Sequence, residues 1–194
     1  MEAEQSNAVA LFWIPIGAGG NGFVRGNGRL YEAYRARVEG RARLALVHSA
    51  LEITANGERY VIENAWPSPD SDTASRGVVV EGPVGTRRAG RLRPLRCEVR
   101  RWRDGVIPDA AEAIGGPVVV GTAPDLARAV LDLVPAVPPL TWGRRPAGSS
   151  EMWNSNSVIA WLLVRAGVAD ADARLPRGAR APGWQTGVEV AERG

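Results

Sequence analysis

Lysine is absent from this chain of 194 residues, so arginine supplies all 24 of its basic side chains. Without lysine the chain has no residue for a Schiff base, for a phosphate-binding P-loop or for the nucleotide contact of a kinase. A single cysteine, Cys97, excludes an internal disulfide framework. A single histidine, His48, excludes a zinc site with the usual ligand spacing, so we expect no metal.

Long hydrophobic runs are also missing. No segment approaches the ~18 apolar residues that a membrane span needs. The apolar run 8–16 lacks the basic flank of a signal peptide, so we expect a cytoplasmic protein without a transmembrane segment. Apolar residues make up 45% of the chain and charged residues 23%, which is ordinary for a globular protein. We expect a single domain over 1–194, with flexible ends at 1–7 and 171–194.

A glycine-rich stretch follows the first strand-like run. Gly17, Gly19 and Gly22 fit the G-x-G-x-x-G pattern of dinucleotide sites. In those sites the third glycine opens a helix, whereas here Gly26 and Gly28 interrupt the residues after Gly22. We therefore expect a flexible loop in this stretch and no cofactor.

Strand patterns dominate the first half of the chain. The Asn56-Gly57 pair is a strong hairpin signal, and it makes the strands expected at 43–53 and 59–66 antiparallel neighbours. Along the chain, strands come first and a buried helix comes late, and this order predicts an α+β fold with an antiparallel sheet. The other expected elements are a strand before residue 17, helices at 30–38 and 122–134, strands at 76–82 and 95–102, and a short strand at 187–190.

The segment 87–103 is rich in arginine and poor in acidic residues. Alternation in its second half places Cys97 on the apolar side of a strand, where we expect a buried and unreactive thiol. We expect the arginines to be mainly solvent-facing, and to suit an anionic ligand better than nucleic acid. These arginines are Arg87, Arg88, Arg91, Arg93, Arg96, Arg100, Arg101 and Arg103.

The stretch EMWNSNSVIAWLL, residues 151–163, sets two Asn-Ser pairs before an apolar run. Asn and Ser accept hydrogen bonds from the free N–H groups of a helix's first turn, so they predict a helix start. No polar stripe interrupts the run before Arg165, so we expect this helix to be buried on all sides. A hydroxyl at its start is either a cap or a nucleophile favoured by the helix dipole.

One imidazole, one carboxylate and one hydroxyl form the candidate constellation. The order LVHSALEI, YVIEN and NSNSVIAWLL resembles the circularly permuted papain-like fold of NlpC-type peptidases and lecithin retinol acyltransferases. The resemblance implies that His48 is the base and that Glu63 orients it. It places Ser157, preceded by Asn156, at the position of the nucleophilic cysteine. On this interpretation His48 and Ser157 face one another across a cleft.

Three functions fit these patterns. The first is a hydrolase or acyltransferase that attacks an amide or ester of a small molecule, peptide or lipid through Ser157. The second is a catalytically silent papain-like module that binds a peptide, a lipid or a partner protein in the same cleft. The third is an unrelated α+β protein whose arginine-rich strand binds an anionic polymer.

Overall fold

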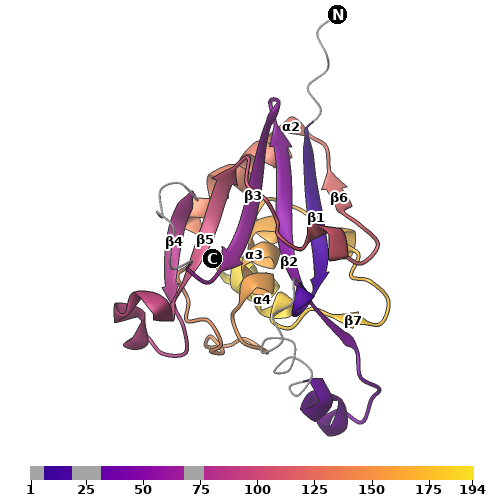
Figure 1. The fold of residues 1–194 in the computed structure, drawn as a ribbon, viewed down its shortest axis with the longest axis vertical. Coiled ribbons are helices and arrows are strands. Elements are labelled where there is room, and N and C mark those ends of the chain that lie inside the picture. The colour runs from indigo at the N-terminus through magenta and orange to yellow at the C-terminus, as the bar shows by residue number, and fades with distance from the viewer. Residues whose placement is uncertain (1–6, 19–31, 68–76) are drawn as a thin grey trace, which may run out of the picture.

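The computed structural model describes residues 7–18, 32–67 and 77–194 (Figure 1). Within these ranges, seven strands form the sheet, in the order β4-β5-β3-β2-β1-β6 with β7 beside β2. Only the β7–β2 pair among them is parallel. The expected α+β class is confirmed. The strands are β1 (Ala8–Pro15), β2 (Ala45–Ala55), β3 (Glu58–Ala65), β4 (Val78–Pro83), β5 (Arg96–Arg103), β6 (Val118–Gly121) and β7 (Ala179–Arg180).

The hairpin of β2 and β3 forms the centre of the sheet. Asn56 and Gly57 connect the strands with φ angles of 52° and 78°. Two consecutive positive φ angles define the type I′ turn, whose twist matches the twist of the flanking strands. Ala55 accordingly pairs with Glu58 directly across the turn. The hairpin predicted from the Asn-Gly pair is confirmed.

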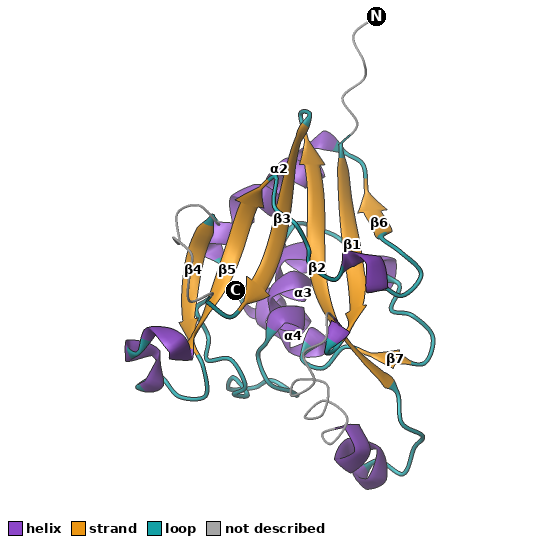
Figure 2. Ribbon diagram, viewed as in Figure 1, coloured by secondary structure: helices purple, strands orange, loops and turns teal. Residues whose placement is uncertain are grey.

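Three helices cover one face of the sheet (Figure 2). The middle helix contacts β2 and β3 on one side and the last helix on the other. Its residues from Ser155 to Leu163 are all buried, as the absence of a polar stripe predicts. The expected late, buried helix against an antiparallel sheet is therefore present. The helices are α2 (Pro124–Leu133), α3 (Ser155–Arg165) and α4 (Trp184–Arg193).

The opposite face of the sheet carries a second, smaller apolar cluster that includes Ile14, Ala50 and Val61. The short helical turn η4 (Ala110–Glu112) contacts β1 on this side and lies in front of the sheet in Figure 1. Ala50 belongs to this small cluster, whereas the next residue, Leu51, belongs to the large core beneath α3. Strand β2 is thus buried on both faces.

The end of the chain differs from the short strand expected there. Residues 187–190 lie inside helix α4, which packs against α3. The helix forms because its inward face is apolar and because Gly187 lets the two helix backbones approach. A Cβ atom on Gly187 would lie 2.2 Å from the carbonyl oxygen of Ser157. The expectation of a strand at 187–190 is therefore wrong.

Two further expectations concern the N-terminal third of the chain. Gly17 has a φ of 85°, whereas Gly19 and Gly22 of the glycine loop lie outside the described residues. Residues 30 and 31 of the expected first helix also lie outside them, and 32–38 are helical. No helix in the described ranges has both the length and the apolar character to cross a bilayer.

The close packing of α4 on α3 makes Gly187→Ala a sharp test of this architecture. We expect the added methyl group to force the helices apart and to lower the free energy of unfolding by ~1–3 kcal/mol. Denaturant unfolding monitored by tryptophan fluorescence measures the change. Gly194→Ala is the control, since its Cβ would meet only the Val190 carbonyl oxygen at 3.9 Å. Equal stability of both variants would contradict the helix packing.

Candidate site at the start of helix α3

The first turn of α3 is closed by a reciprocal cap. The side-chain oxygen of Asn154 accepts hydrogen bonds from the backbone N–H groups of Asn156, at 2.9 Å, and Ser157, at 3.3 Å. The Ser157 hydroxyl accepts in return from the backbone N–H of Asn154 at 3.1 Å. This is a capping box, which satisfies donors that a helix start otherwise leaves free.

The Ser157 hydroxyl is also used as a donor. It donates to the carbonyl oxygen of Gly183 at 2.6 Å, and Ser157 has no solvent-exposed surface. Gly183 itself has a φ of 81°, and a Cβ there would lie 2.6 Å from the Met152 carbonyl oxygen. A side chain at position 183 would clash with this backbone, so glycine is the residue that fits beside the hydroxyl. The hydroxyl is buried and bonded as both donor and acceptor.

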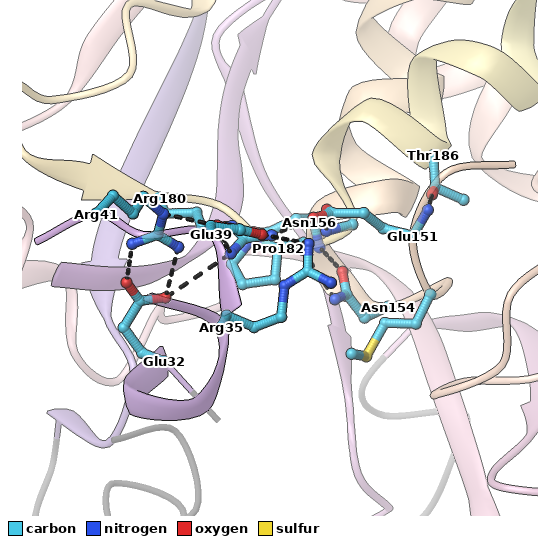
Figure 3. Close-up of polar contacts among 12 residues, drawn as sticks. Glu32, Arg35, Glu39, Arg41, Glu151, Asn154, Asn156, Arg180, Pro182 and Thr186 are labelled. Carbon is cyan, nitrogen blue, oxygen red and sulfur yellow. Dashed lines mark hydrogen bonds and ion pairs between the residues drawn. The ribbon is translucent and has the colours of Figure 1, made fainter. Parts of the chain in front are cut away.

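Asn156 extends this contact to the sheet. Its amide nitrogen donates to the carbonyl oxygens of Val47, at 3.0 Å, and Pro182, at 2.9 Å. Its amide oxygen accepts from the Ser49 hydroxyl at 2.9 Å. One carboxamide therefore joins α3, strand β2 and the turn before α4. Figure 3 shows Asn156 beside Pro182. We call the side chains of Ser49, Asn154, Asn156 and Ser157, with the backbone of Gly183, the α3 junction.

His48 lies on the other face of the sheet. Side chains alternate along a strand, and the neighbours of His48, Val47 and Ser49, face α3. Across the strand pair His48 lies opposite Ile14, a member of the small cluster on the far face. The sheet therefore separates His48 from Ser157. The expected cleft between them is not formed, and among the described residues the hydroxyl bonds only to backbone groups.

The environment of His48 keeps its imidazole neutral. Burial lowers the pKa of His48 below its usual 6.5, and the nearby Asp109 carboxylate opposes this effect only in part. Asp109 immediately precedes η4, on the face away from α3. His48 is therefore a half-buried, neutral residue of the far face.

Glu63 lies on the same face as His48 but is engaged elsewhere. It pairs with Arg100 across β3 and β5, and the Arg100 guanidinium contacts its carboxylate at 2.7 Å. Arg100 also contacts the fully buried Glu98 at 3.0 Å. Within the described residues, no hydrogen bond or ion pair joins Glu63 to His48. The carboxylate is part of a buried ion-pair cluster and does not orient the imidazole.

The rest of the arginine-rich segment divides between surface and interior. Arg100 is 7% exposed, and Arg101 donates to the Leu131 carbonyl oxygen. Cys97 is buried, and burial raises the pKa of its thiol to about 11, as expected for an unreactive core residue. Five of the eight arginines are exposed to solvent, as expected: Arg87, Arg88, Arg91, Arg93 and Arg103.

A pocket that sequence analysis missed lies beside the α3 junction. It is a cavity of about 420 Å³ between β1, β7 and the start of α4. The indole rings of Trp13 and Trp184 form its apolar wall, with ring centroids 4.7 Å apart. Trp184 donates its ring N–H to Asp170, and Trp13 donates to the carbonyl oxygen of Ala173. Other lining residues are Arg35, Glu151, Leu175 and Arg180.

An ion-pair network that includes the pocket-lining residues Glu151 and Arg180 lies beside the pocket (Figure 3). Arg180 pairs with Glu151 and lies 3.6 Å from the Glu39 carboxylate. Arg41 binds Glu32, and this contact holds the pKa of Glu32 below its usual 4.5. The Nη1 atom of Arg180 and the Nε atom of Arg35 are buried without a hydrogen-bond acceptor. Both arginines line the pocket, and their guanidinium groups are held there by Glu39 and Glu151.

Sequence alone offered little to locate this pocket. Trp13 and Trp184 are 171 positions apart along the chain, and the segment around Trp184 has the composition of a loop. Comparisons with protein-family models, with curated proteins and with solved structures found no match. The papain-like resemblance accordingly remains an interpretation of the sequence. Within the described residues, no cluster of three potential metal ligands occurs.

Removing the Ser157 hydroxyl tests its structural role. In Ser157→Ala the Asn154 N–H loses its bond to the hydroxyl, and the Gly183 carbonyl keeps only the bond from the Gly187 N–H. The free energy of unfolding is therefore expected to fall by ~1–3 kcal/mol. Ser150→Ala, at an exposed serine nearby, is the control and is expected to change little. Chemical denaturation of the three proteins measures both effects. A Ser157→Ala protein as stable as the parent would argue against the junction.

The single imidazole of this chain gives a direct test of His48. We expect its proton NMR titration to have a midpoint below 6.5, because burial disfavours the charged form. The unfolded chain then binds a proton at higher pH than the folded chain, so stability falls as pH drops below about 6.5. His48→Gln is expected to lose that part of the pH dependence. A midpoint above 6.5 would contradict the burial of His48, because it would require the attraction of Asp109 to exceed the effect of burial.

Proposed function

We propose that this protein is a catalytically silent, papain-like binding module that holds its ligand in the pocket beside the α3 junction. The single observation that carries the proposal is the fully buried Ser157 hydroxyl, which donates to Gly183 while an open pocket begins at the next residue, Trp184. A nucleophile needs a base within reach and access to substrate. Ser157 has neither, whereas the pocket is accessible and pre-formed.

The hydrolase or acyltransferase interpretation fits this geometry poorly. It requires proton transfer from the Ser157 hydroxyl to His48, and the sheet lies between the two side chains. It also requires Glu63 to orient the imidazole, but Glu63 is paired with Arg100. A binding role needs none of these contacts, so it is the better supported function.

The lining of the pocket indicates what kind of ligand it takes. The indole ring of Trp184, which packs on the buried Trp13, and the exposed side of Leu175 suit a flat or aliphatic group. The guanidinium groups of Arg35 and Arg180, which also line the pocket, suit an oxygen acceptor such as a carboxylate, sulfonate or carbonyl group. A small molecule, a peptide or a lipid with both features fits. These ligand classes and a cytoplasmic location, both expected from the sequence, belong to this proposal.

Anilinonaphthalene sulfonate carries both features and is the probe we choose. We expect the native protein to bind it, and Leu175→Trp to weaken the binding by about tenfold, equivalent to ~1.4 kcal/mol, because the larger ring fills the pocket. Val106→Trp adds the same side chain at another exposed position, 61% exposed in the parent, and serves as the matched control. Isothermal titration gives the dissociation constants.

Two results would overturn the proposal. One is the absence of probe binding to the native protein. The other is binding that Leu175→Trp and Val106→Trp change equally, since this would place the probe outside the pocket. Turnover of an activated ester that is lost in both Ser157→Ala and His48→Gln would restore the hydrolase interpretation instead.

A further inference from the structure

A short excursion between β4 and β5 projects from one end of the sheet. It contains the helical turns η2 (Ala89–Arg91) and η3 (Arg93–Leu95), seen at the lower left of Figure 2. The residues from Pro83 to Leu95 include four arginines and no acidic residue. All four, Arg87, Arg88, Arg91 and Arg93, are exposed.

A second segment brings further arginines to this excursion. The backbone N–H of Trp142 donates to the Pro83 carbonyl oxygen at 2.8 Å, and the Gly85 N–H donates to the Trp142 carbonyl oxygen at 2.9 Å. The Arg144 guanidinium binds the Gly85 carbonyl oxygen. Arg144 and its exposed neighbour Arg145 therefore lie beside the excursion. We call these six residues the basic surface: Arg87, Arg88, Arg91, Arg93, Arg144 and Arg145.

Few carboxylates balance this charge. Within the described part of the chain, Arg87, Arg88, Arg91 and Arg145 form no ion pair. Arg87 and Arg91 line a shallow hollow of about 390 Å³ together with Arg96 and Glu81. The Arg96 guanidinium contacts the Glu81 carboxylate at 2.9 Å and so neutralises the one acidic side chain of the lining. A phosphate group in the hollow would find two unpaired guanidinium groups, which match its geometry.

Apolar side chains stand exposed among these charges. Leu92 is 62% exposed and Leu95 is 37% exposed, both within the excursion. Trp66, 51% exposed, contacts Trp142 with ring centroids 6.3 Å apart. Arginine, leucine and tryptophan exposed together are typical of surfaces that lie at the boundary between lipid headgroups and acyl chains.

We propose that the basic surface docks this protein on a phospholipid bilayer rich in anionic lipids. The arginines contact headgroup phosphates, with Arg87 and Arg91 holding one phosphate in the hollow, while Leu92 and Leu95 enter the acyl boundary. Nucleic acid would satisfy the arginines but would leave Leu92 in water, so a bilayer uses more of the observed surface. This docking is independent of the ligand in the pocket.

Vesicle sedimentation tests the proposal on the full chain. We expect binding to vesicles of phosphatidylcholine mixed with phosphatidylglycerol, and little binding to phosphatidylcholine alone. Each arginine at an anionic surface contributes about 1 kcal/mol, or about fivefold in the partition coefficient. Arg87→Gln combined with Arg91→Gln is therefore expected to weaken binding by about 25-fold. Leu92→Ser is expected to weaken binding that remains at high salt.

Arg128→Gln combined with Arg177→Gln is the matched control, since it removes the same charge from exposed arginines outside the basic surface. An equal loss in this control would overturn the proposal and show an effect of net charge only. Equal binding to both vesicle types would overturn it as well. Binding of soluble glycerol phosphate or of duplex RNA as tight as binding to the anionic vesicles would assign the surface to that ligand instead.

Discussion

The carboxamide of Asn156 is the contact on which the rest of the fold depends. It bonds at once to the Val47 carbonyl of β2, the Pro182 carbonyl before α4 and the Ser49 hydroxyl. Because these partners are buried, losing any of them would leave a polar group unsatisfied. The junction joins α3 to the sheet and to the turn before α4, and Trp184, the residue after Gly183, lines the neighbouring pocket. Apolar surfaces can pack together in several ways, and a buried polar network whose hydrogen bonds are all satisfied selects one of these packing arrangements.

Features set by local chemistry could be predicted from the sequence. The Asn56-Gly57 pair specifies its turn because both residues adopt positive φ readily, and the hairpin follows. Asn154 and the apolar run after it specify a capped, buried helix. Alternation placed Cys97 in the core. Each of these patterns acts within a few residues along the chain.

Features that depend on contacts between residues distant in sequence could not be predicted from the sequence. The face of β2 on which His48 lies depends on register, and a shift of one residue exchanges the faces. The resemblance implies that His48 faces α3, but Ser49 occupies that position. The α3 junction therefore consists of amides and hydroxyls and contains no imidazole. The tail was expected as a loop because its many Gly and Pro residues obscure the helical face that only α3 completes. The pocket depends on the same long-range contacts.

Ser157→Cys in the native fold gives the most direct measurement of whether the α3 junction is structural. The quantity is the rate of alkylation of the new thiol by iodoacetamide at neutral pH, with the parent protein reporting Cys97. A structural junction predicts alkylation only as fast as the protein unfolds, and a rate that His48→Gln does not reduce, because the position is buried and the imidazole lies beyond the sheet. Rapid alkylation that depends on His48 would contradict this structure of the site and would indicate a poised nucleophile.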